Sequence, residues 1–440
     1  MDEDTKPAHV VIGVGDTDAD ALTSQVAALG DRVRANPEQW PPAGLEPAEV
    51  VAAHPCRLAL ASSAPRELLE QLEAAARYLA TGAGKRLLGG AGIFTSEPGL
   101  EARGTLAMIF PGQGAQYVGM LTELASTSDV VRRCLEEADE VMTPLLDRRL
   151  TDVIAGRGVD REAADQALMQ TMVTQPAVLA CDVAVCRLLE AHGVRADVVA
   201  GHSLGEYAAA VAAGVMSFPD ALRTVFVRAR EMTSATPPGV DPGRMAALRA
   251  PLEVVEALMA EVGGTLVAAN KNSPNQTIVA GASDAVDAVM ALADQRGVVA
   301  KRLPVSHAFH TAIVEPACEP LARVLRGVAL EPPRIPLLAN VTGALYPTGP
   351  GSAEAVVDLL SRQVARPVEF IAEVERMYDL GVRTFVEVGP GRTLSTFVSK
   401  VLGKRPHQAF SSIQPQKGER RSFAECLAAL LASGVAVNDE

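Results

Sequence analysis

The chain has 440 residues, of which 48% are hydrophobic and 4% aromatic, and a formal net charge of −13 at neutral pH. This length supports two or three hydrophobic cores, and the acidic balance argues against a nucleic-acid partner. Because no uncharged apolar run reaches about 18 residues and the N-terminus is acidic, we expect neither a membrane span nor secretion. The cysteines are scattered without metal-ligand spacing, which predicts reduced thiols and a cytoplasmic location.

Residues 1–103 have the pattern of a small α/β unit. Apolar runs at 10–12 and 57–60 predict strands, and the stretches 19–36 and 65–81 predict helices. We find no constellation of catalytic side chains in this unit. The reactive chemistry is therefore expected further along the chain.

An apolar run at 105–110 predicts the next strand, and the Gly-rich turn 111–114 follows it directly. Such a turn presents backbone N–H groups near a strand end, where they can stabilise a developing negative charge. An ordinary connection between a strand and a helix has the same pattern. The residues of this turn alone leave both interpretations open.

The pentapeptide from Gly201 to Gly205 predicts a nucleophile elbow with Ser203 at its tip. Residues 197–200 are apolar and predict a buried strand, while the Ala-rich stretch after Leu204 predicts a helix that ends near Gly214. Two glycines permit a sharp turn that exposes the serine hydroxyl over a helix N-terminus. A serine-capped helix after a glycine turn is the alternative.

A nucleophilic serine needs a base, and His307 and His310 are the best-placed candidates. They lie in a loop between a predicted strand and a helix that begins near residue 313. His202 sits beside Ser203 on the tight turn, so we expect it to be structural or to stand at the edge of the substrate site. Two histidines three apart also suit a metal, but no acidic or cysteine ligand is nearby in sequence, so no metal is expected.

Arg228 is the candidate for substrate charge. It follows an apolar stretch on a predicted helix, where a buried guanidinium needs a partner. An internal salt bridge or an anionic substrate would each supply one.

Residues 244–305 predict a unit of their own, in the order βαββαβ of ferredoxin-like domains. The predicted strands are 245–248, 266–268, 277–279 and 298–303, and the predicted helices are 252–262 and 283–295. Residues 104–243 and 306–400 alternate strand and helix, as in a parallel α/β sheet of hydrolase-like topology. The inserted unit separates Ser203 from its base, which predicts an active site between two subdomains.

Five motifs in this order resemble the malonyl-CoA:acyl carrier protein transacylases. These are the run 109–116, the elbow 201–206, Arg228 before Met232, the loop 306–310 and the run 387–391. More narrowly, the chain is similar to the acyltransferase domain of a type I polyketide synthase. The motifs span most of the chain.

The resemblance implies a catalytic role for each matching position. Ser203 takes the acyl group as an ester, and His310 is the general base and acid, while His307 belongs to the pocket wall. The imidazole of His310 is oriented by the backbone carbonyl of Gln363 rather than by an acidic side chain. The amides of Gln113 and Leu204 form the oxyanion hole.

The resemblance also implies the substrate. Arg228 pairs with the free carboxylate of a malonyl group, and Gln175 lines the same acyl pocket. Phe309 beside the base, and Leu204 after the serine, resemble malonyl-selective members rather than methylmalonyl-selective ones. No cofactor is expected to be bound permanently: malonyl-CoA is the donor and the phosphopantetheine of an acyl carrier protein is the acceptor.

By the same resemblance, residues 1–103 match the linker domain between a ketosynthase and an acyltransferase, so a ketosynthase domain is an expected partner. Residues 401–440 match the segment that follows such acyltransferases. Three alternatives stay open from the sequence: a serine acyl hydrolase, a methylmalonyl-selective transferase and a non-catalytic docking module.

Overall fold

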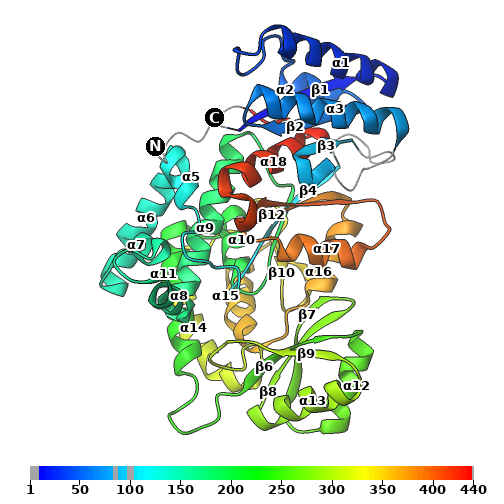
Figure 1. The fold of residues 1–440 in the computed structure, drawn as a ribbon. Coiled ribbons are helices and arrows are strands. Elements are labelled where there is room, and N and C mark those ends of the chain that lie inside the picture. The colour runs from blue at the N-terminus through cyan, green and yellow to red at the C-terminus, as the bar shows by residue number, and fades with distance from the viewer. Residues whose placement is uncertain (1–8, 83–87, 97–103, 439–440) are drawn as a thin grey trace.

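A computed structural model describes residues 9–82, 88–96 and 104–438. Figure 1 shows three parts of the structure, from top to bottom: an N-terminal unit, a central α/β core and a small sheet unit. The helix α18 (Glu419–Ala432) lies between the first two.

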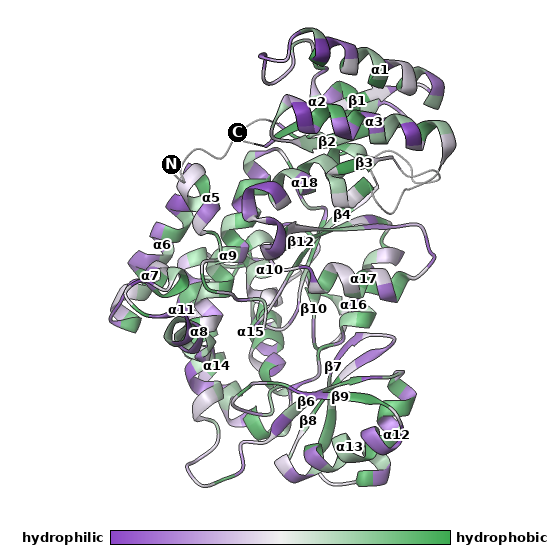
Figure 2. Ribbon diagram, in the orientation of Figure 1, coloured by the Kyte–Doolittle hydropathy of each residue, from purple (hydrophilic) through white to green (hydrophobic). Residues whose placement is uncertain are grey.

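The N-terminal unit is a three-stranded antiparallel sheet in the order β1-β2-β3. Its elements are β1 (Val10–Asp16), α1 (Ala19–Ala35), α2 (Ala48–Ala53), β2 (Cys56–Ser62), α3 (Pro65–Thr81), η2 (Gly89–Ala91) and β3 (Ile93–Thr95). Asp18 caps α1, and α3 ends at Gly82 with a left-handed φ of 66°. Along α1 and α3 hydrophobic and hydrophilic residues alternate, as Figure 2 shows, so each helix buries one face on the sheet.

The central sheet has four parallel strands in the order β13-β12-β4-β5. These are β4 (Thr105–Phe110), β5 (Val198–Gly201), β12 (Val382–Pro390) and β13 (Gln408–Ile413). Alternate residues of each strand point to opposite faces. Leu106, Met108 and Phe110 join one hydrophobic cluster, whereas Ala107 and Ile109 join the other. The sheet is thus buried on both faces, as parallel sheets usually are.

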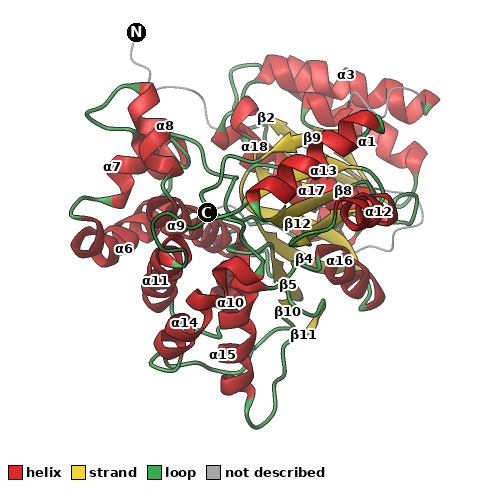
Figure 3. Ribbon diagram, turned by 90° about the horizontal axis from the view of Figure 1, so that it is seen from below, coloured by secondary structure: helices red, strands yellow, loops and turns green. Residues whose placement is uncertain are grey.

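Helices cover both faces of this sheet. α16 (Phe370–Asp379) and α17 (Thr393–Leu402) supply the smaller cluster. A larger set of helices covers the other face, and Figure 3 shows α6, α8, α9 and α11 of this set gathered on one side of the strands. The set consists of α5 (Thr122–Thr127), α6 (Asp129–Leu146), α7 (Leu150–Ala155), α8 (Arg161–Met169), α9 (Thr171–Ala191), α10 (Gly205–Ala212), α11 (Phe218–Ser234), α14 (Cys318–Leu325) and α15 (Ser352–Arg362). The short elements are η3 (Ala312–Ala317), β10 (Leu338–Ala339), β11 (Ala344–Leu345), η4 (Gln363–Ala365) and η5 (Pro415–Lys417).

Among the described helices, only α9 has the length and apolar composition of a membrane span, with a mean hydropathy of 1.5 in its apolar window. Within the protein 89% of that window is buried. The helix packs against α6, α11 and β12. α9 is therefore a central helix of the core.

The small sheet unit has the predicted order βαββαβ. Its elements are β6 (Arg244–Arg249), α12 (Leu252–Val262), β7 (Leu266–Ser273), β8 (Gln276–Gly281), α13 (Ser283–Gln295) and β9 (Val299–Arg302). The strands pair antiparallel in the order β7-β8-β6-β9, with both helices packed on one hydrophobic cluster. Backbone bonds between Lys271 and Val368, and between Val368 and Ala269, join this unit to the core.

The structure corrects the predicted boundary at residue 400. β13 pairs in parallel with β12, so it is an edge strand of the core sheet rather than part of a following segment. α18 then packs against β13 on one side and against β1, β2 and β3 on the other. Through these contacts β13 and α18 pack as part of the core and against the N-terminal unit.

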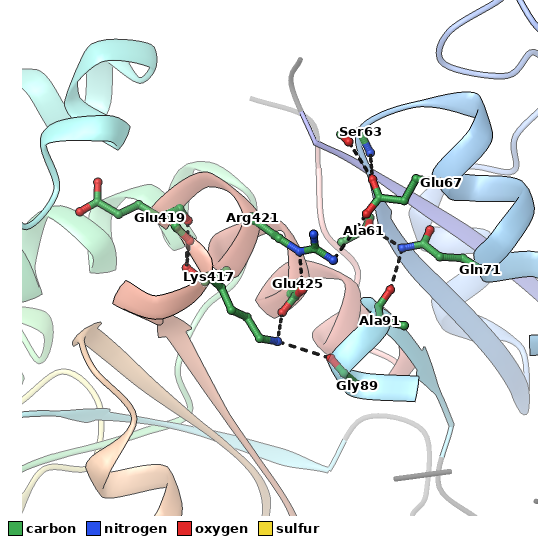
Figure 4. A network of polar contacts seen from close by, with 12 residues as sticks. Ala61, Ser63, Glu67, Gln71, Gly89, Ala91, Lys417, Glu419, Arg421 and Glu425 are labelled. Carbon is green, nitrogen blue, oxygen red and sulfur yellow. Dashed lines mark hydrogen bonds and ion pairs between the residues drawn. The ribbon is translucent and has the colours of Figure 1, made fainter. Parts of the chain in front are cut away.

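Polar contacts fasten α18 to its neighbours (Figure 4). Arg421 donates to Glu425 at 3.0 Å and lies 3.5 Å from Glu67 of the N-terminal unit. In the same first turn of α18, Glu419 accepts hydrogen bonds from the backbone N–H groups of Glu123 and Leu124 of the core at 2.9 and 3.1 Å. One helix therefore ties the N-terminal unit to the core.

Candidate active site

Ser203 stands on a strained turn between β5 and α10, as the sequence predicts. Its φ is 54°, a left-handed conformation that is uncommon for any residue except glycine. A Cβ at Gly201 would overlap the backbone of Gly205, and a Cβ at Gly205 would overlap the carbonyl of Phe110 in β4. The two glycines are therefore required for the helix to approach the sheet so closely.

His310 is the histidine that reaches the serine. Its Nε2 lies 2.8 Å from Ser203 Oγ, and its Nδ1 lies 2.9 Å from the carbonyl of Gln363 and 3.0 Å from that of Arg366. Carbonyl oxygens only accept, so Nδ1 carries the proton and Nε2 is free to accept one from the hydroxyl. No described carboxylate takes the place of these carbonyls.

The electrostatic surroundings keep this imidazole neutral. Burial, and next the nearby Arg228 guanidinium, lower the pKa of His310 to about 3. A neutral imidazole at physiological pH is the form that can act as a base.

The Gly-rich turn after β4 runs along the elbow. The N–H of His202 donates to the carbonyl of Phe110 at 2.9 Å, and a Cβ at Gly112 would overlap the carbonyl of His202. The N–H groups of Gln113 and Leu204 donate to no other group in the described part of the chain. Both are thus free for an external acceptor.

Arg228, on α11, is only 1% exposed and has no carboxylate within 4.0 Å among the described residues. Its NH2 group donates to Gln363 Oε1 at 3.0 Å and to Ser203 Oγ at 3.3 Å, and its Nε has no partner. The guanidinium also lies 5.6 Å from the ring of Tyr207. The internal salt bridge that the sequence left open is therefore not formed, and the cation is available to an anion.

These groups open on one cavity of about 290 Å³ between the core and the small sheet unit. Gln113, His202, Ser203, Arg228, Phe309 and His310 line it, together with apolar side chains of the small sheet unit and the first turn of α17. His202 is held by Asn272, whose Oδ1 lies 2.7 Å from the His202 Nε2. In residues 9–82, 88–96 and 104–438, no group of three or more His, Cys, Asp or Glu side chains is arranged to hold a metal ion.

Two predicted wall residues do not line the cavity. Gln175 is fully buried on α9 and lies behind Met232, whose sulfur is 3.7 Å from Gln175 Nε2. His307 stacks on the ring of Phe309 and contacts Ser306 at 3.0 Å, so that Phe309 occupies the position in the wall. Neither belongs to the lining of this cavity, and a contact of either residue with a bound acyl group stays a prediction.

Asn340 is a site residue that the sequence reasoning missed. Its Oδ1 accepts the N–H of Ser203 at 2.5 Å, and its Nδ2 donates to Glu373 at 2.9 Å and to the carbonyl of Gly201. Asn340 directly follows the apolar residues of β10, and a polar side chain at a strand end was the available signal.

A family model described as "Acyl transferase domain" matches residues 107–436. The chain is 35% identical over 303 residues to the malonyl CoA-acyl carrier protein transacylase of Bacillus subtilis, covering 67% of this chain and 90% of that protein. It is 38% identical over 351 residues to the polyketide synthase GfsB of Streptomyces halstedii, covering 76% of this chain but 6% of the synthase. The chain thus spans most of a stand-alone transacylase and a small part of a synthase.

Solved structures match this chain over different lengths. The malonyl CoA-acyl carrier protein transacylase of Coxiella burnetii superposes with a TM-score of 0.65 at 30% identity, covering 75% of this chain and 98% of its own. The acyl transferase domain of SpnD, in complex with 2-(pent-4-yn-1-yl)malonyl, superposes with a TM-score of 0.78 at 29% identity, covering 97% and 96%. The match to the SpnD domain thus extends over nearly the whole chain.

Proposed function

Because this chain belongs to the acyl transferase domain family, we propose that it moves a malonyl group from malonyl-CoA, through an ester on Ser203, to the phosphopantetheine thiol of an acyl carrier protein. The observation that carries this proposal is the convergence of Ser203, His310, Arg228 and the Gln113 turn on one cavity, with the unpartnered amide of Leu204 directly after the serine. Each supplies a part that acyl transfer requires.

The first half-reaction forms the ester. Ser203 Oγ attacks the thioester carbonyl while its proton passes to His310 Nε2, which lies 2.8 Å away. The amides of Gln113 and Leu204 hold the oxyanion, and one such donor contributes about 3 kcal/mol of transition-state stabilisation. The carbon–sulfur bond then breaks, and the CoA thiol leaves with the proton from His310.

The second half-reaction reverses these steps with a different thiol. The phosphopantetheine thiol gives its proton to His310 and attacks the ester, and Ser203 leaves and takes the proton back. A malonyl-transacylase bound to its acyl-carrier protein is among the solved structures similar to this chain, which supports the choice of acceptor. We also propose that this reaction takes place in the cytoplasm.

Arg228 is the proposed ligand of the malonyl carboxylate. Its planar guanidinium suits two parallel hydrogen bonds to a carboxylate, and no carboxylate of the described residues lies within 4.0 Å of it. The bulk of Phe309 in the cavity wall favours malonyl over methylmalonyl. A methyl group changes such binding by about 1–3 kcal/mol, so this preference is one of degree.

For the N-terminal unit we propose a linker that joins the acyltransferase to a ketosynthase domain. The SpnD domain matches this chain over nearly its whole length, whereas the stand-alone transacylase of Coxiella burnetii covers three quarters of it. The unit is also fastened to the core by α18 rather than being loosely tethered.

Intact-protein mass spectrometry tests the proposed reaction. Incubation with malonyl-CoA should add one malonyl group to the wild-type protein and none to Ser203→Ala. Addition of a carrier protein should move the label to the carrier. Labelling that persists in Ser203→Ala would refute the ester, and release of malonate into water in place of transfer would identify a hydrolase.

A further inference from the structure

A buried carboxylate lies directly behind the nucleophile. Glu206, in the first turn of α10, is fully buried and has no cation within 4.0 Å in the described part of the protein. Its Oε2 accepts a hydrogen bond from Gln363 Nε2 at 2.6 Å. Its Oε1 accepts from the hydroxyl of Tyr346 and, at 3.4 Å, from the N–H of Asn340. The proposed mechanism assigns no role to this side chain.

The side-chain amide of Gln363 connects this carboxylate to Arg228. Its Nε2 donates to Glu206 and also to the carbonyl of Ser203, each at 2.6 Å. Its Oε1 accepts from Arg228 at 3.0 Å. The two ends of an amide have opposite roles, so two acceptors at the nitrogen end fix the oxygen toward the guanidinium. If the Gln363 amide were rotated by half a turn, its NH2 group would point at the Arg228 guanidinium.

This arrangement places a carboxylate near the buried charge of Arg228 without forming a direct ion pair with it. A buried guanidinium is costly without a partner, yet a direct ion pair would have to break before a substrate carboxylate binds. With an amide between them, Glu206 acts on Arg228 from a distance and forms no ion pair that a substrate carboxylate would have to break. The Nε of Arg228 has no partner, as this reasoning requires.

We propose that Glu206 is a positioning residue for malonyl selection, which orients the Gln363 amide so that Arg228 is held in place for the substrate carboxylate. The inference rests on the proposed function, because it deepens the account of the same site. It assigns Glu206 an effect on malonyl that acetyl, which lacks a carboxylate, does not share.

The acceptor that faces Gln363 is retained whether or not Glu206 is ionised. Burial raises the pKa of Glu206 to about 7, against the opposing effects of Tyr346, Gln363, Asn340 and Arg228. A proton on Oε1 can be donated to the Tyr346 oxygen once that hydroxyl turns, and Oε2 still accepts from Gln363. A glutamine at position 206 has the same option, so the hydrogen bond rather than the charge performs the positioning.

The test compares Glu206→Leu with Glu206→Gln, by steady-state loading from malonyl-CoA and by acetyl labelling of Ser203. We expect Glu206→Leu to raise the KM for malonyl-CoA about tenfold, which is the effect of losing one charge-assisted hydrogen bond between Arg228 and the malonyl carboxylate. The same variant should change acetyl labelling less than about threefold. Glu206→Gln should restore the KM to within about threefold of wild type. Equal losses for malonyl and acetyl, an unchanged KM in Glu206→Leu, or failure of Glu206→Gln to rescue would each overturn the proposal.

A second variant keeps the test decisive if Glu206→Leu does not fold. Gln363→Leu removes the amide and keeps the main-chain carbonyl that His310 uses. It should lower the malonyl-to-acetyl ratio as Glu206→Leu does, and the double variant should add little to either. Additive losses would show that the two residues act separately.

Glu419→Leu is the matched control, because Glu419 is also a buried carboxylate with several donors but lies on α18 away from Arg228. It should lower the melting temperature and leave the malonyl-to-acetyl ratio unchanged. If wild type itself gains no malonyl group, the proposed function fails. If wild type is labelled but Glu206→Leu has an unchanged malonyl-to-acetyl ratio, only the positioning role of Glu206 is refuted.

Discussion

Ser203 and His310 share a left-handed backbone conformation, with φ values of 54° and 62°, and their side chains meet at 2.8 Å. Such conformations cost on the order of 1–3 kcal/mol each in residues other than glycine. In this protein both are held by surrounding bonds: Ser203 N–H to Asn340, and His310 N–H to the carbonyl of Val364 at 2.8 Å. The proposed nucleophile and the proposed base are thus positioned by their backbones in the absence of substrate.

His310→Ala should slow both half-reactions by about a thousandfold or more, because one imidazole is base in one direction and acid in the other. Rapid-quench measurement of acylation and deacylation checks this. His307→Ala should have a milder effect, since His307 does not line the cavity. The opposite ranking of the two variants would contradict the assignment of His310.

Arg228→Ala should reduce malonyl loading strongly, because it removes charge-assisted hydrogen bonds worth about 1.5–3 kcal/mol each. Acetyl loading should stay level or rise, since the variant no longer leaves a buried cation unpaired when acetyl binds. The ratio of malonyl to acetyl on Ser203 is the quantity to measure. An unchanged ratio would mean that Arg228 has only a structural role.

Phe309→Ser should enlarge the cavity and raise methylmalonyl loading relative to malonyl loading by about tenfold. A change of this size is within the range of selectivity that one methyl group produces in a binding pocket. Competition between the two CoA thioesters, followed by mass analysis of Ser203, measures the change. A constant product ratio would place the discrimination elsewhere in the cavity.

The buried neutral His310 should make folding stability depend on pH. The unfolded histidine binds a proton near its ordinary pKa of 6.5, whereas burial keeps the folded one neutral until about pH 3. The unfolded state binds more protons between these values, so stability rises with pH across this window. From pH 7 to pH 5 this group should cost about 2 kcal/mol of unfolding free energy.

Urea unfolding at both pH values, in wild type and in His310→Asn, isolates that contribution from the other titrating groups. The variant should lose about 2 kcal/mol less than wild type on acidification. Equal losses would show that His310 is readily protonated in the folded protein.

Sequence patterns predicted the parts of the site that are local in the chain. The elbow around Ser203 needs glycines at two fixed positions, and Arg228 stands out as a charge on an apolar helix, so both were visible without a structure. The order of strands and helices in the small sheet unit followed from hydrophobic periodicity. The resemblance to a family then chose His310 over His307.

The remaining parts depend on contacts between distant segments. Asn340 and the Gln363 side chain reach Ser203 from 137 and 160 residues further along the chain. No periodicity indicates which of many buried amides will do so. β13 was missed because its short run has only a weak apolar pattern. The charged first turn of α18 resembles surface sequence, although every residue of this helix except Arg420 and Arg421 is buried.

The position of α18 bears on how the chain folds during translation. The sheet of the N-terminal unit is made from residues 10–95, but one of its faces is covered by Glu419–Ala432. At roughly 5–20 residues per second, a ribosome takes on the order of half a minute to add the intervening segment. For that time this face of the nascent sheet lacks the cover of α18 and keeps only the contact with the short helix α2. The N-terminal unit of a ribosome-bound chain should therefore be a chaperone client until α18 emerges.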